Sequence, residues 1–77
     1  MSDKKKAEAV FTRFTEAETK VFDAQEEAIQ YLEQGAKDKE IQPVAVIVNY
    51  KVVWRYHNNR GKEYTDDYIN EIRRRAQ

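Results

Sequence analysis

The strongest constraint on the fold is the stretch PVAVIVNYKVVWRYHNNRGK at residues 43–62. Residues 44–48 form a continuous run of apolar, mostly β-branched side chains, which is typical of a strand covered on both faces. Asn49 and Tyr50 interrupt this run, and asparagine tolerates the left-handed backbone of a tight turn. Residues 51–56 predict a second strand. The stretch therefore indicates two strands joined by a tight reversal near the centre of the core.

Strict alternation within residues 51–56 places Val52, Trp54 and Tyr56 on one face and Val53 and Arg55 on the other. Trp54 admits two interpretations. If it packs in the core, the basic residues around it form an ordinary solvated face. If it is exposed, it belongs to a binding surface, because tryptophan is enriched at interface hot spots.

The N-terminal part predicts a pair of strands. Residues 9–15 are rich in β-branched and aromatic side chains, and residues 19–22 form a second short strand after a polar break at residues 16–18. Residues 1–8 carry charge and little apolar surface, so we expect a flexible tail there. Residues 9–77 are then a single domain, which is all that a chain of this length allows.

Residues 24–34 predict the first helix, because apolar side chains recur there at helical spacing. Asp23 and Glu26 have the spacing of a capping box at its start. Gly35 is placed to end the helix in a left-handed conformation.

A second helix is expected at residues 66–76 with Thr65 as its N-cap, since acidic side chains fill its first turn and arginines its last. The element order β-β-α-β-β-α predicts a small α+β fold with one antiparallel or mixed sheet of about four strands. Helix 24–34 covers one face. The C-terminal helix packs on that face, caps a sheet end or extends to a partner. The expected core residues are Val10, Phe14, Phe22, Ala28, Leu32, Val44, Val46, Val48, Val53, Tyr68 and Ile72.

The composition excludes most kinds of catalytic and metal-binding site. The 77 residues include no cysteine, which excludes disulfides and thiolate metal sites, and His57 is the only histidine. The only serine is Ser2, and neither glycine begins a phosphate-binding pattern. We therefore expect no enzyme activity, no cofactor and no metal. A weaker alternative uses His57 as a general acid or base, with Arg55 or Arg60 stabilising an anion.

Charge separates along the chain although the total is zero. The 14 basic and 14 acidic residues balance, which argues against a nucleic-acid domain that binds through bulk charge. Residues 21–40 nevertheless hold six acids and two bases, whereas residues 41–62 hold four bases and no acid. The basic half ends in a polar loop. The predicted binding residues are Tyr50, Arg55, His57, Asn58, Asn59, Arg60 and Lys62.

These observations favour a small non-enzymatic protein-interaction module of the adaptor, inhibitor or regulatory type, acting in the cytoplasm. Five tyrosines exceed what so small a core can hold, and Tyr50 and Tyr64 are expected at the surface. An edge strand at residues 10–15 or 51–56 could pair with a protein partner or with a second copy of the chain. The alternative is nucleic-acid binding through the basic and aromatic residues 54–62. No stretch is apolar enough to span a membrane.

Overall fold

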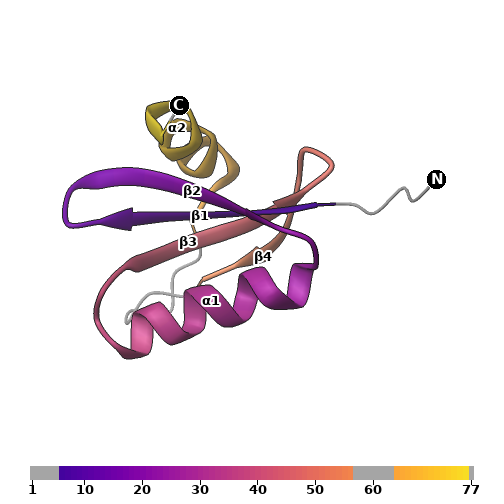
Figure 1. Ribbon diagram of the computed structural model, residues 1–77. Coiled ribbons are helices and arrows are strands. Elements are labelled where there is room, and N and C mark those ends of the chain that lie inside the picture. The colour runs from indigo at the N-terminus through magenta and orange to yellow at the C-terminus, as the bar shows by residue number, and fades with distance from the viewer. Residues whose placement is uncertain (1–5, 57–63, 77) are drawn as a thin grey trace.

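The protein folds around a four-stranded antiparallel sheet that carries one helix on each face (Figure 1). The computed structural model describes residues 6–56 and 64–76. The strands are β1 (Ala7–Arg13), β2 (Glu16–Phe22), β3 (Gln42–Val48) and β4 (Lys51–Arg55), in the sheet order β2-β1-β3-β4. The helices are α1 (Gln25–Lys37) and α2 (Asp66–Ala76). The predicted α+β fold and its element order are confirmed.

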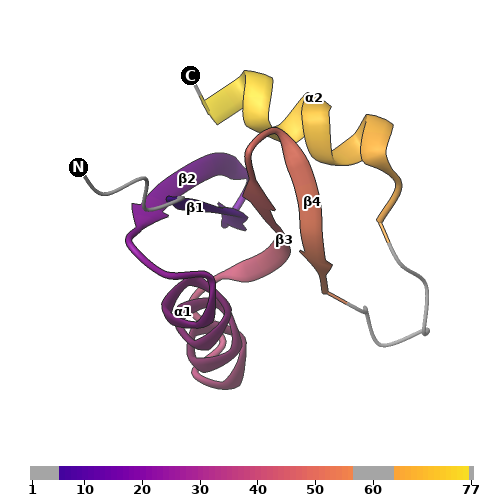
Figure 2. The same ribbon diagram turned by 90° about the vertical axis from the view of Figure 1, so that its right-hand side faces the viewer.

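The two helices enclose the sheet from opposite sides (Figure 2). The core on the α1 side consists of Ala7, Ala9, Phe11, Ala28, Leu32, Ile41 and Val46. The core on the α2 side consists of Val10, Val44, Ala45, Ile47, Ile69 and Ile72. None of the three positions expected for the C-terminal helix is right, because the structure packs α2 on the face opposite α1. This arrangement explains why β3 is apolar on both faces.

A β-bulge changes the direction of side chains in β3. Val10 pairs with Ala45 but Phe11 pairs with Pro43, so Val44 is an extra residue on β3. Val44 consequently faces the α2 side together with Ala45. Val44 and Ala45 are both buried in the α2-side core. Their apolar side chains suit a strand that is covered on both faces.

A second bulge overturns the predicted facing of β4. Val46 pairs with Trp54 and Ile47 with Val52, which leaves Val53 as the extra residue. Trp54 therefore packs on the α1 side and Val52 on the α2 side, although alternation placed them on the same face. Val53 was expected in the core, but it is 41% exposed because the bulge turns it outward.

The β1–β2 hairpin is longer and tighter than predicted. β1 begins at Ala7, which is fully buried, so Ala7 and Glu8 belong to the strand and not to a tail. The polar residues 16–18 are also strand, and the turn is at Phe14 and Thr15 instead. Phe14 was expected in the core but is 94% exposed. Since β1 pairs with both β2 and β3, it is an internal strand, and the predicted edge at residues 10–15 is wrong.

Both ends of α1 differ from the prediction. The N-cap is Ala24, which makes no side-chain capping hydrogen bond, so the capping box based on Asp23 is wrong. At the other end the helix continues through Gly35 to Lys37. Lys39, and not Gly35, adopts the left-handed conformation, with φ 59°.

The C-terminal end of α1 forms a Schellman motif. The N–H of Lys39 donates to the carbonyl of Ala36 at 3.1 Å, and the N–H of Glu40 donates to the carbonyl of Gly35 at 3.0 Å. After this motif the chain turns back toward α1, and the side chain of Ile41 packs directly on Gly35. Gly35 therefore allows the Ile41 side chain to approach the α1 backbone closely, and it does not terminate the helix.

α2 has the predicted limits. Thr65 Oγ1 accepts a hydrogen bond from the N–H of Tyr68 at 3.2 Å, which confirms Thr65 as the N-cap. Tyr68 was expected in the core but is 43% exposed, and Ile69 is buried in its place. Within residues 6–56 and 64–76, neither helix combines the length and apolar character that crossing a bilayer requires.

Candidate functional site

The predicted binding residues that the structure describes do not come together. Tyr50 lies in the β3–β4 turn and is 91% exposed, whereas Arg55 ends β4. At the rise of a β-strand the two positions are roughly 15 Å apart. His57, Asn58, Asn59, Arg60 and Lys62 lie outside the described residues.

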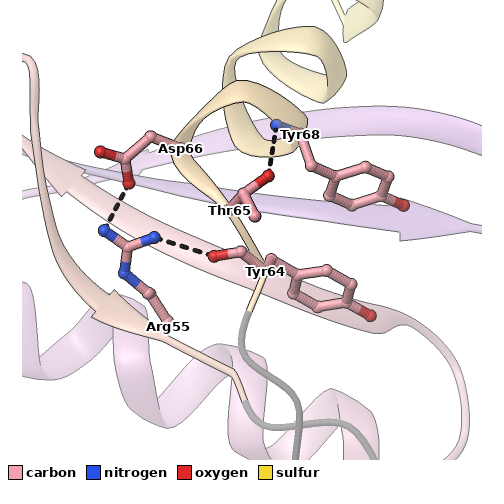
Figure 3. Close-up of polar contacts among 5 residues, drawn as sticks. All are labelled: Arg55, Tyr64, Thr65, Asp66 and Tyr68. Carbon is pink, nitrogen blue, oxygen red and sulfur yellow. Dashed lines mark hydrogen bonds and ion pairs between the residues drawn. The ribbon is translucent and has the colours of Figure 1, made fainter.

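Arg55 is engaged inside the protein (Figure 3). Its Nη1 donates to the backbone carbonyl of Tyr64 at 2.8 Å, and its Nη2 forms an ion pair with the carboxylate of Asp66. Asp66 is the first residue of α2, where a negative charge also favours the helix dipole. Arg55 thus ties the end of β4 to the start of α2, which leaves its guanidinium less available to a partner.

The position of Trp54 favours the core interpretation. Its side chain is half-buried against the α1-side core, and its ring lies 6.0 Å from that of Tyr56 at a tilted angle of 49°. Such tilted pairs are favourable aromatic packing. Trp54 therefore contributes to the stability of the sheet.

Two exposed aromatic residues adopt a backbone conformation that normally belongs to glycine. Phe14 has φ 59° in the β1–β2 turn, and Tyr50 has φ 65° in the β3–β4 turn, next to Asn49 at φ 54°. A left-handed conformation costs an L-residue about 1–2 kcal/mol. Both side chains are more than nine-tenths exposed, so packing offsets little of this cost. Strain of this kind concentrates at functional positions.

A groove of about 560 Å³ opens beside Phe14. Its lining residues come from the β1–β2 hairpin, the last turn of α1, the segment that leads into β3, and Tyr56 after β4. We call it the Phe14 groove. Phe14, Ile41 and Tyr56 supply its apolar surface, and Lys39 and Glu40 add one charge of each sign. Its volume is in the range of ligand-binding pockets.

The groove is connected to α2 through a tyrosine pair. Gln42, which lines the groove, donates from Nε2 to the hydroxyl of Tyr64 at 3.4 Å. The ring of Tyr64 stacks on Tyr68 with centroids 5.0 Å apart. Tyr64 was expected at the surface, but it is half-buried, and this burial raises the pKa of its phenol.

The groove is suited to binding. Its described lining residues offer apolar surface, an amide and two opposite charges, and they include no histidine. Nowhere in residues 6–56 and 64–76 do three His, Cys, Asp or Glu side chains gather as metal ligands would.

Sequence reasoning missed Phe14 because alternation with Val10 assigned it to the core. The charge pattern contained a usable signal. Arg13 and Glu18 form an ion pair at 3.2 Å across the hairpin, and this contact requires the turn at residues 14–15. Opposite charges at those positions favour a hairpin with Phe14 at its tip.

No protein-family model, curated protein or solved structure matches this chain.

Proposed function

We propose that this protein is a non-enzymatic interaction module of the adaptor, inhibitor or regulatory type, which binds an extended segment of a larger protein in the Phe14 groove. One observation carries the proposal: an almost fully exposed phenylalanine is held at φ 59° at the edge of a groove. Glycine would satisfy the turn without strain, so the phenyl ring has a role that the fold does not require.

The composition of the groove defines the kind of segment that it fits. An aliphatic or aromatic side chain of the partner would lie against Phe14 and Tyr56, and burial of these rings would supply most of the binding free energy. Lys39 and Glu40 would pair with polar groups on the flanks. The cysteine-free composition suits the reducing cytoplasm, where we expect the protein to act.

Nucleic-acid binding through residues 54–62 has less support. Trp54 packs against the core, and Arg55 is paired with Asp66, so two of the three described residues of this segment are occupied. The two hypotheses differ in salt dependence. Phosphate contacts weaken steeply as salt increases, whereas insertion of an apolar side chain does not.

The test selects binding peptides from a random library displayed on phage and measures their affinity for two matched variants. Phe14→Gly removes the ring and relieves the turn, so we expect affinity to fall at least about thirty-fold, as for other aromatic hot spots. The same variant should melt at a higher temperature, since the strain of about 1–2 kcal/mol is gone. Tyr50→Gly relieves the turn at the opposite end and should retain binding.

Two outcomes would overturn the proposal. One is a selection that recovers no peptide above background. The other is a set of peptides that bind Phe14→Gly and the original protein with equal affinity. Gain of stability together with loss of binding in Phe14→Gly distinguishes a functional ring from a merely tolerated one.

A further inference from the structure

The outer edge of β2 has a regular set of backbone groups directed away from the sheet. β2 ends the strand order, and Arg13 pairs with Glu16 across a two-residue turn. The residues flanking such a turn form a hydrogen-bonded pair, and pairing alternates from there. Residues 16, 18, 20 and 22 therefore bond to β1. Ala17, Thr19 and Val21 direct their N–H and C=O groups outward from the edge.

We propose that β2 pairs antiparallel with β2 of a second copy of this chain, about a two-fold axis at Thr19. Thr19 then lies opposite Thr19, and Ala17 opposite Val21 of the second copy. All three outward-facing residues form hydrogen-bonded pairs in this register. It uses the full length of β2, Glu16–Phe22, and joins two four-stranded sheets into one continuous sheet.

In this register the charges of β2 are complementary, with no pair of like charges directly opposite each other. Glu18 lies opposite Lys20 of the second copy, and symmetry makes this contact twice. Glu18 also pairs with Arg13 of its own chain at 3.2 Å, and its side chain stays 40% exposed, so the contact with Lys20 would be added to that pair. The two residues share the α1 side of the sheet, since their β1 partners are Phe11 and Ala9. They occupy non-hydrogen-bonded positions, where side chains approach most closely. Moving the axis to residue 18 places Glu18 opposite Glu18, although it also sets Glu16 opposite Lys20, and moving it to residue 20 places Lys20 opposite Lys20. Each of these registers therefore contains a repulsive pair at its centre.

The other edge of the sheet lacks this complementarity. In β4, an antiparallel pair centred on Val53 would place Lys51 opposite Arg55 of the second copy, so like charges would face each other. The bulge at Val53 also interrupts the regular backbone pattern there, which is a feature of edges that resist pairing. The observations therefore favour β2 as the surface for a second copy.

The exposed side chains of β2 agree with an interface. Val21 is 55% exposed, and pairing would place it beside Ala17 of the second copy. Lys20 Nζ lies 4.8 Å from the ring centroid of Tyr31, which holds the ammonium on the α1 side, where Glu18 of the second copy would approach. Antiparallel pairing also sets the two Phe14 turns at opposite ends of the joined sheet.

The test is a charge-swap series measured by analytical ultracentrifugation from micromolar to millimolar protein. The original chain should form a concentration-dependent dimer. Glu18→Lys opposes two lysines at each contact and should raise the dimer dissociation constant at least about tenfold. The double variant Glu18→Lys with Lys20→Glu restores opposite charges and should recover dimerisation. Glu16→Lys is the matched control, because Glu16 lies opposite Phe22 of the second copy.

A second measurement does not depend on any variant. Hydrogen exchange of the original protein should slow at the amides of Ala17, Thr19 and Val21 as the concentration rises, while the amides of β4 stay unchanged. A monomer throughout the concentration range would overturn the proposal, as would equal weakening by Glu16→Lys and Glu18→Lys. Assemblies larger than a dimer would also contradict it, because they indicate open-ended pairing of β2 with β4.

Discussion

Replacing Gly35 with alanine tests how closely α1 and the return to β3 are fitted together. Gly35 lies inside α1 and is buried. A Cβ atom at this position would lie 2.5 Å from Cγ1 of Ile41 and 2.6 Å from its Cδ1. Real Cβ atoms do not approach other carbons so closely, and Cγ1 moves only if the whole Ile41 side chain rotates.

Two effects of opposite sign determine the outcome. Alanine is favoured over glycine in a helix interior by about 1 kcal/mol. Overpacking a buried site typically costs about 1–3 kcal/mol. Because two carbons of Ile41 are overlapped, we take the overpacking cost as about 2 kcal/mol. Gly35→Ala should then lower the free energy of unfolding by about 1 kcal/mol.

A double-mutant cycle separates the two effects. Ile41→Ala removes both overlapping carbons, so Gly35→Ala should stabilise that background by about 1 kcal/mol through helix propensity alone. The coupling energy between the two sites is then about 2 kcal/mol. Urea denaturation followed by circular dichroism measures all four proteins. If Gly35→Ala stabilises the original protein, or if the two changes are additive, the close packing of Ile41 on Gly35 is not what requires a glycine there.

Three further changes test the turns and the tyrosine pair. Lys39→Gly should raise the free energy of unfolding by about 0.5–1 kcal/mol, because Lys39 occupies the left-handed position of the Schellman motif at φ 59°. Urea denaturation measures the change, and an unchanged midpoint would contradict this. Tyr50→Gly should raise the melting temperature by about 4–8 °C, since Asn49 and Tyr50 both have positive φ and Asn-Gly is preferred in such turns; a lower value would count against a strained turn. Burial raises the pKa of the Tyr64 phenol, so its contribution to stability is complete below about pH 10 and is lost as pH rises through the folded pKa. Tyr64→Phe should therefore lose less stability than the original protein in alkaline melts, and identical pH profiles would refute the assignment.

Much of the fold could be predicted because local patterns specify it. The limits of α2 and its cap at Thr65 follow from charge and capping preferences that act within one helical turn. The apolar run that became β3 indicated a strand covered on both faces, and two helices cover it. These features need no knowledge of which strands are neighbours.

The candidate site was harder to predict, because its residues become neighbours only in the folded chain. Phe14 and Tyr56 line one groove, although they are far apart in sequence. Arg55 was predicted to lie on a binding surface. The sequence does not show that Asp66, which belongs to α2, lies close enough to form an ion pair with it. Of the predicted binding residues in the described ranges, Tyr50 is exposed as expected, and its left-handed backbone could not be inferred from its residue type.

The sequence by itself determined the element order, the element types and the absence of cysteine chemistry, because periodicity, capping and composition are local properties. Tertiary structure decided which residue each bulge leaves unpaired, since register depends on the partner strand. Val53 is exposed and Trp54 is packed for that reason. Tertiary structure also decided the role of Gly35, which allows Ile41 to pack closely against α1. The left-handed conformations occur instead at residues such as Lys39 and Phe14. Contacts between segments that are distant in the sequence stabilise these conformations. A short stretch of neighbouring residues does not include those contacts, so it cannot predict them.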